Sequence, residues 1–234
     1  RPVVLTFGDA LFGERRSHVR LMPPPTFVPR DIHVVPRPPV KPDEPITIGF
    51  FGQFRREKHL EELLRVYLSG NYTRPVRLLV QGSTMHAEDA AEFERIIAAY
   101  AGKGIIFLHR GLIGAEWQRA ISEVDALLLP YSAPRYRYHW GAMLFTAIGF
   151  QKPVLTSDDM NPEVFERFPI GITFRSGDTA ALRAALETFI NAYDVRAPQW
   201  QTALRCAAQE YAPARFAAQI VSVAEEKDSN GALP

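Results

Sequence analysis

Short apolar runs alternate with stretches of helical periodicity from Ile46 onward. The run Ile46–Phe51 has the length and continuity of a buried strand. Apolar residues then recur at intervals of three and four, which gives the next segment one apolar helical face. The residues on this face are Leu60, Leu63, Leu64, Tyr67 and Leu68. The same alternation of strand and helix continues as far as Ala192.

The pattern predicts six strands and the helices that connect them. The expected strands are Ile46–Phe51, Val76–Gln81, Ile105–His109, Ala126–Leu129, Val154–Thr156 and Gly171–Phe174. The expected helices lie near Leu60–Leu68, Ala90–Tyr100, Ala115–Glu123, Gly141–Phe150, Pro162–Phe168 and Thr179–Ala192. Such an alternation is typical of a parallel sheet with helices on both faces. We therefore predict an α/β fold, a doubly wound Rossmann-like domain over residues 46–192.

Proline marks the N-terminal boundary of this domain. More than half of the 19 prolines fall within residues 1–45. Because proline has no amide hydrogen, residues 19–45 are expected to form an extended connector rather than a helix or a central strand. Val3–Phe7 is a candidate short strand. Residues 1–45 are therefore predicted to be either a proline-rich arm on the surface or an interdomain linker.

Two more helices are expected after the α/β domain, near Trp200–Glu210 and Pro213–Glu226. Residues 193–234 are thus predicted to be C-terminal helices with a frayed tail from Lys227 to the end. One face of the last helix is apolar and is expected to be buried. This face carries Phe216, Ile220 and Val223.

Composition and charge exclude several classes of protein. A hydrophobic fraction of 47% supports a packed core, and a net charge of +1 disfavours a nucleic-acid partner. The single Cys206 excludes a disulfide framework and indicates a reducing, cytoplasmic location. No apolar run approaches the ~18 residues of a membrane span. The chain begins with Arg1 instead of Met, so we expect it to be part of a longer protein.

Glycine and polar residues follow the predicted strands. In an open parallel sheet, ligands bind beyond the carboxyl ends of the strands, so a ligand cleft is expected there. Turn geometry alone is the alternative explanation for these glycines. A helix that starts at Gly141 would also present free amides and a positive dipole end to a phosphate. The strand-end segments are Gly52–Lys58, Gly82, Arg110–Gly111, Pro130–Tyr131 and Ser157–Asp158.

Seven motifs arrive in the order and at the spacing of a known family. They are IGFFGQFRREK, LLVQGS, IIFLHRGLI, VDALLLPY, HWGAMLFTAIGFQKPVLTSD, PEVFERFPIGITF and SGDTAALRAALETFI. Residues 46–192 thereby resemble the C-terminal, donor-binding domain of GT-B glycosyltransferases of the family 4 type. The resemblance covers about two thirds of the chain, and it is the ordered series rather than any single motif that is specific.

The resemblance implies a site for a nucleoside diphosphate sugar. In the family, an Arg and a Lys after the first strand grip the phosphates of the donor. Lys58 matches the Lys, the Arg position holds Gln53, and Arg55 or Arg56 is the substitute for the missing charge. The implied site residues are Gly52, Gln53, Arg55, Lys58, Tyr138, His139, Trp140, Gly141, Ala142 and Thr146. Gly141→Val is expected to block the phosphate with little effect on the fold if the helix survives.

The family also carries two glutamates around the Gly141 helix, and this chain has neither. Alignment on Gly141 places them at Tyr138 and Thr146, so a retaining mechanism is not implied. Glu163 matches a recurrent acidic position of the family, with a favourable charge at a helix N-terminus as the alternative. His139 has no acidic partner by spacing, so no catalytic residue is assigned.

The leading functional hypothesis is the donor-binding half of a glycosyltransferase. It would transfer a sugar from a nucleoside diphosphate sugar to a glycan or lipid-linked acceptor in bacterial surface polysaccharide synthesis, in the cytoplasm or at the inner membrane. No cofactor or metal is expected. The acceptor domain would come from a missing N-terminal part or another chain. The alternatives are a non-catalytic binding module of the same fold and a sugar-nucleotide epimerase.

Overall fold

The computed structural model describes residues 4–6, 18–27, 29–30, 40–41, 43–133, 136, 139 and 141–231. For residues 4–6, Leu21, Glu57 and residues 226–231 it describes the backbone alone. The candidate site residues Tyr138 and Trp140 lie outside the described residues.

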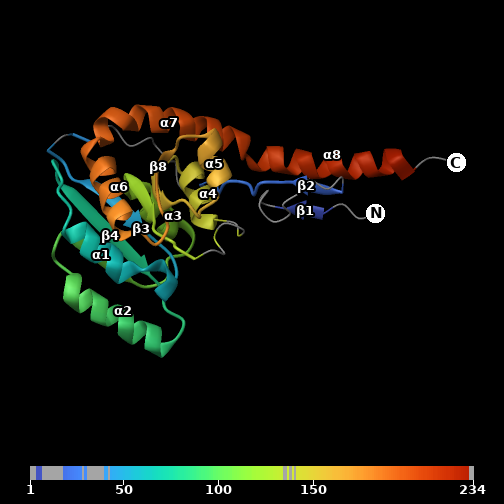
Figure 1. Cartoon of the computed structure of the whole chain (residues 1–234). Coiled ribbons are helices and arrows are strands. Elements are labelled where there is room, and N and C mark those ends of the chain that lie inside the picture. Colours follow the sequence, from blue (N-terminus) through green and yellow to red (C-terminus); the bar gives the residue numbers. More distant parts are fainter. Residues whose placement is uncertain are drawn as a thin grey trace.

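A six-stranded parallel sheet forms the centre of the molecule (Figure 1). Its strands are β3 (Ile46–Phe50), β4 (Val76–Gly82), β5 (Ile105–His109), β6 (Ala126–Leu129), β7 (Val154–Ser157) and β8 (Gly171–Phe174). They lie in the order β5-β4-β3-β6-β7-β8. Strands β6 and β7 are buried along their whole length, which explains why they are continuous apolar runs without alternation. The predicted doubly wound α/β class is confirmed.

Helices cover both faces of the sheet. They are α1 (Leu60–Leu68), α2 (Ala87–Tyr100), α3 (Gly114–Glu123), α4 (Ala142–Gly149), α5 (Pro162–Arg167) and α6 (Thr179–Asn191). The chain moves outward from β3 to β5 and then crosses to β6 on the other side of β3. Because parallel crossovers are right-handed, this reversal places the helices before and after the crossing on opposite faces. Helix α4 contributes Leu144 to Ile148 to the core and is buried on nearly every side.

Two longer helices follow the sheet. Helix α7 (Tyr193–Glu210) starts seven residues before the predicted Trp200, because it accommodates Pro198. The ring removes only the intrahelical bond to the carbonyl of Asp194, in the first turn. Helix α8 (Pro213–Gly231) extends away from the body (Figure 1). It continues through Lys227 to Gly231, beyond the predicted end at Glu226.

The expectation that the apolar face of α8 is buried is wrong at its centre. Ile220 is 44% exposed, whereas Phe216 and Val223 are half-buried. The helix projects past the body, so the described residues do not cover this face fully. No helix in the described part of the chain is both long and apolar enough to cross a membrane.

The N-terminal segment contains two short strands that pair in parallel, β1 (Val4–Thr6) and β2 (Val19–Leu21). Strand β2 falls within the predicted connector, where its three residues gave no recognisable pattern. The residues after it pack on the body. Met22 and Thr26 are buried, and the amide of Thr26 donates to the carbonyl of Tyr211 at 2.8 Å.

Gly149→Ala is expected to destabilise the protein by about 1–3 kcal/mol, through overpacking against this segment. A Cβ on Gly149 would lie 1.9 Å from the carbonyl oxygen of Phe27. Thermal unfolding measures the effect, and Gly111→Ala is the matched control because a Cβ there meets nothing within 4 Å. If Gly149→Ala instead stabilised the protein through helix propensity, the packing of the segment on α4 would be incorrect.

Candidate functional site

The loops after β3 and β6 meet at the point where the order of the sheet reverses. The two strands are neighbours in the sheet, but the chain leaves them in opposite directions. Ligands of open parallel sheets bind in the crevice at this switch point, outside the carboxyl ends of the strands. The β3 loop carries Gly52 to Lys58, and the segment after β6 leads to Gly141 at the start of α4.

The loop after β3 is held against the loop after β4. Gln53 forms a bridge with Ser83, and the amide of Phe54 donates to the carbonyl of Ser83 at 2.8 Å. Gly52 has a φ of 116°, which an L side chain rarely adopts. Glycine at this position is therefore required for the path of the chain as it leaves β3.

Lys58 lies between the two loops of the switch point. It ends a short 3₁₀ turn (Arg56–Lys58), and the residue is only 8% exposed. Its Nζ lies 5.0 Å from the centre of the Tyr131 ring and 5.7 Å from that of Phe50. A Cβ on Gly52 would be 3.1 Å from the same Nζ, so the ammonium lies close to the backbone of the β3 loop. Aromatic faces stabilise a cation in such a position.

The two candidate arginines point to different partners. Arg55 remains at the loop, where its guanidinium donates to the Gln53 side chain at 3.2 Å. Arg56 is paired with Glu92 of α2, with 2.7 Å between Nε and the carboxylate. This hydrogen bond, together with the charge of Glu92, raises the pKa of Arg56 above its ordinary value. Of the two, Arg55 is the one that stays beside Gln53.

The N-terminus of α4 is built differently from the sequence expectation. The amide of Gly141 donates to Oδ1 of Asn161 at 3.1 Å, so this amide already has an acceptor. The amides of Leu144 and Phe145 bond to the carbonyl of Gly141. The amides of Ala142 and Met143 have no intrahelical acceptor, because they belong to the first turn. The first-turn amides of α4 therefore differ from the Gly141 amide, which is already bonded to Asn161.

The expectation that Gly141→Val has little effect on the fold is wrong. A Cβ on Gly141 would lie 2.5 Å from Sδ of Met160 and 2.6 Å from Oδ1 of Asn161. Asn161 itself is buried and has a φ of 42°, in the left-handed region that asparagine tolerates. A branched side chain at Gly141 would therefore displace Asn161 and disturb the start of α4.

The other candidate residues occupy distinct environments. Thr146 is buried, and its hydroxyl donates to the carbonyl of Ala142 within α4 at 2.9 Å. His139 is exposed, and its carbonyl accepts a 3.4 Å hydrogen bond from Asn161. Glu163 lies in the first turn of α5 and accepts from Asn161 at the same distance. The side chain of Asn161 thus connects the segment before α4 to α5.

Sequence reasoning did not single out Asn161, and it noted Tyr131 only as a strand-end residue. Asn161 directly precedes Pro162, the first residue of α5, and this pairing is the available sequence signal of a helix start. Tyr131 is fully buried, and desolvation raises the pKa of its hydroxyl above the ordinary value. A neutral Tyr131 ring therefore persists beside Lys58 at physiological pH.

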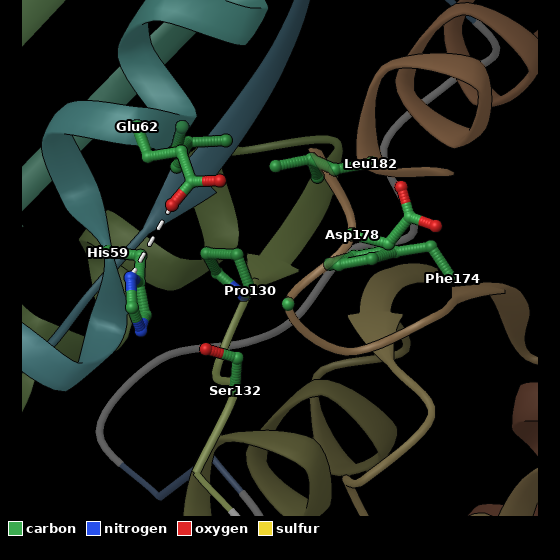
Figure 2. A pocket seen from close by; sticks show the side chains of 9 residues that line it. His59, Glu62, Pro130, Ser132, Phe174, Asp178 and Leu182 are labelled. Carbon is green, nitrogen blue, oxygen red and sulfur yellow. Dashed lines mark ion pairs between the residues drawn. The ribbon is translucent and has the colours of Figure 1, made fainter. Parts of the chain in front are cut away.

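A small pocket opens beside the switch point, over the ends of β6 and β8 (Figure 2). It is lined by His59, Glu62, Leu63, Pro130, Ser132, Phe174, Gly177, Asp178 and Leu182. Nδ1 of His59 lies 3.5 Å from the Glu62 carboxylate. The volume is about 20 Å³, which holds about one water. This pocket is therefore too small for a nucleotide. Nor does the described part of the chain contain three or more His, Cys, Asp or Glu side chains grouped to hold a metal ion.

Comparison with solved structures shows the same fold in glycosyltransferases. HepE from Anabaena, solved with UDP and glucose, superposes with a TM-score of 0.72 at 16% identity, over 96% of this chain and 63% of its own. Sucrose-phosphate synthase from Thermosynechococcus elongatus has a TM-score of 0.70 at 18% identity, over 97% of this chain and 59% of its own. No protein-family model matches the sequence, and no curated protein sequence matches it.

A third structure consists of one domain. The C-terminal domain of the group 1 glycosyltransferase LpcC from Francisella tularensis has a TM-score of 0.59 at 17% identity, over 74% of this chain and 88% of its own. The chain thus has the fold of the C-terminal, donor-binding domain of GT-B glycosyltransferases. It spans about three fifths of the length of the solved sucrose-phosphate synthase and HepE chains.

Proposed function

We propose that the chain binds a nucleoside diphosphate sugar at the β3–β6 switch point and serves as the donor-binding half of a glycosyltransferase. The observation that carries this proposal is the position of Lys58. Its ammonium lies between the two loops of the switch point, in a fold whose solved relative HepE holds UDP and glucose. A cation at this place is what the diphosphate of such a donor requires.

The chemistry follows from the charge of the leaving group. During transfer, the bond between the anomeric carbon and the β-phosphate oxygen breaks, and the oxygen of the acceptor hydroxyl forms the new bond to that carbon. The proton of this hydroxyl passes to the departing diphosphate or to solvent. Negative charge then develops on the departing diphosphate. Lys58, Arg55 and the first-turn amides of α4 would offset this charge without a metal ion. The acceptor, a glycan or a lipid-linked saccharide, would be bound by a further domain or chain.

Calorimetric titration of the chain with UDP, GDP and ADP tests the proposal. We expect saturable binding of at least one diphosphate, with weaker binding of the matching monophosphate and nucleoside, because the cationic groups contact the phosphates. Absence of binding by all three diphosphates would refute donor binding.

A non-catalytic binding module of the same fold is the second candidate. The observation that favours it is Thr146, which stands where the family has a glutamate and whose hydroxyl is already bonded to Ala142. Donor binding without sugar transfer, measured with the full-length protein and an acceptor extract, would select this alternative. Release of the diphosphate together with a glycosylated product would exclude it.

A further inference from the structure

A buried glutamine of strand β4 connects two loops of the candidate site. Gln81 lies near the end of β4, between β3 and β5, and is 2% exposed. Its Oε1 accepts a hydrogen bond from the amide of Gly52 at 2.9 Å, and its Nε2 donates to the carbonyl of Arg110 at 2.5 Å. The side chain therefore spans from the loop after β3 to the loop after β5.

The partners determine which way the amide group points. A backbone amide can only donate and a carbonyl can only accept, so the oxygen of Gln81 must face Gly52 and its nitrogen must face Arg110. An apolar residue of similar size would remove both hydrogen bonds and leave the Gly52 amide and the Arg110 carbonyl without these partners. A glutamine is thus required if both loops are to keep these positions.

The Gly52 end of this connection leads directly to Lys58. Gly52 has a φ of 116°. A Cβ on Gly52 would lie 3.1 Å from the ammonium of Lys58, so the ammonium is close to the Gly52 backbone. A shift of the Gly52 backbone would therefore move the surface against which the ammonium rests.

We propose that Gln81 is a positioning residue of the donor site, which holds Gly52 in place and through it pre-organises Lys58 for the diphosphate. This inference rests on the proposed donor binding. Preorganisation increases affinity because the bound geometry costs less to reach. Gln81 itself need not touch the ligand.

A double-mutant cycle with UDP as the probe tests this inference. Gln81→Leu is expected to weaken UDP binding about tenfold, measured well below the unfolding temperature. If Gln81 acts through Lys58, the double variant Gln81→Leu/Lys58→Met binds no more weakly than Lys58→Met alone. Lys152→Met is the matched control. Lys152 lies at the opposite edge of the sheet, where its Nζ donates to the backbone carbonyl of Ser122. The substitution removes this hydrogen bond. It should lower stability without changing affinity.

Gln81→Glu provides a second, independent measurement. Its protonated carboxyl can accept from Gly52 and donate to Arg110, whereas the ionised form can only accept. We therefore expect Gln81→Glu to bind UDP more weakly than the wild type does at pH 8. As the pH falls towards 5, the affinity of the variant should approach that of the wild type at the same pH.

The outcomes are distinguishable. If the wild type binds none of the diphosphates, the proposed function fails and this inference fails with it. If the wild type binds UDP and folded Gln81 variants bind it equally well, donor binding stands and the positioning role is overturned. The positioning role is also overturned if the losses of UDP affinity in Gln81→Leu and Lys58→Met add up in the double variant. It is overturned as well if the affinity of Gln81→Glu relative to the wild type does not change with pH.

Discussion

Replacing Lys58 with Met is expected to weaken nucleoside diphosphate binding roughly ten- to a hundredfold, which corresponds to about 1.5–3 kcal/mol for a charge-assisted hydrogen bond. Methionine removes the ammonium but keeps an apolar stem between Phe50 and Tyr131, so the two loops should remain packed. Calorimetry of the variant with the diphosphate that the wild type binds best measures the loss.

The matched control is Lys103→Met. Lys103 also lies beside an aromatic ring, that of Tyr100, but it precedes β5 and so lies at the opposite edge of the sheet. This control should bind as the wild type does.

Thr146→Ala should change affinity much less than Lys58→Met, because the Thr146 hydroxyl is bonded within α4. Equal affinity of the wild type and Lys58→Met would eliminate the donor site proposed here and favour the non-catalytic module.

Arg74→Ala is expected to lower the free energy of unfolding by about 3 kcal/mol, or the Tm by roughly 6–12 °C for a chain of this size. The Arg74 side chain is 7% exposed and forms an ion pair with Asp194 of α7. It also donates to the carbonyls of Lys41 at 2.9 Å and Glu44 at 3.1 Å. One guanidinium thus joins the segment before β3 to the turn before β4 and to α7.

Two further variants make this prediction specific. Arg74→Lys keeps the charge but cannot reach all three acceptors, so an intermediate loss is expected. Arg196→Ala, an exposed arginine on the same helix α7, should leave the unfolding transition unchanged. UDP affinity should be unaffected in all three variants because Arg74 lies at the edge opposite the candidate site. A Tm of Arg74→Ala equal to that of the wild type would contradict the role of this contact.

The strands were predictable because they are short, largely apolar runs bounded by turn residues. Ile105–His109, Ala126–Leu129 and Gly171–Phe174 match the structure at both ends, since a continuous apolar run between turn residues has few alternatives. Prediction failed where a local signal was weak or misleading. The three residues of β2 carry no pattern, and the helix expected near Trp200 in fact begins at Tyr193.

The sequence by itself determined the parallel sheet and the order of its elements, because these follow from local periodicity. It also predicted the edge at which a ligand is expected, because the carboxyl ends of parallel strands lie at one edge. It also placed Lys58 and Gly141 on loops at that edge. Only the tertiary structure decided how they are used. The amide of Gly141 bonds to Asn161, Lys58 lies against Tyr131 and Phe50, and Gln81 joins two loops. These contacts pair residues far apart in the chain, and such pairings depend on the packing of the whole domain rather than on any local pattern.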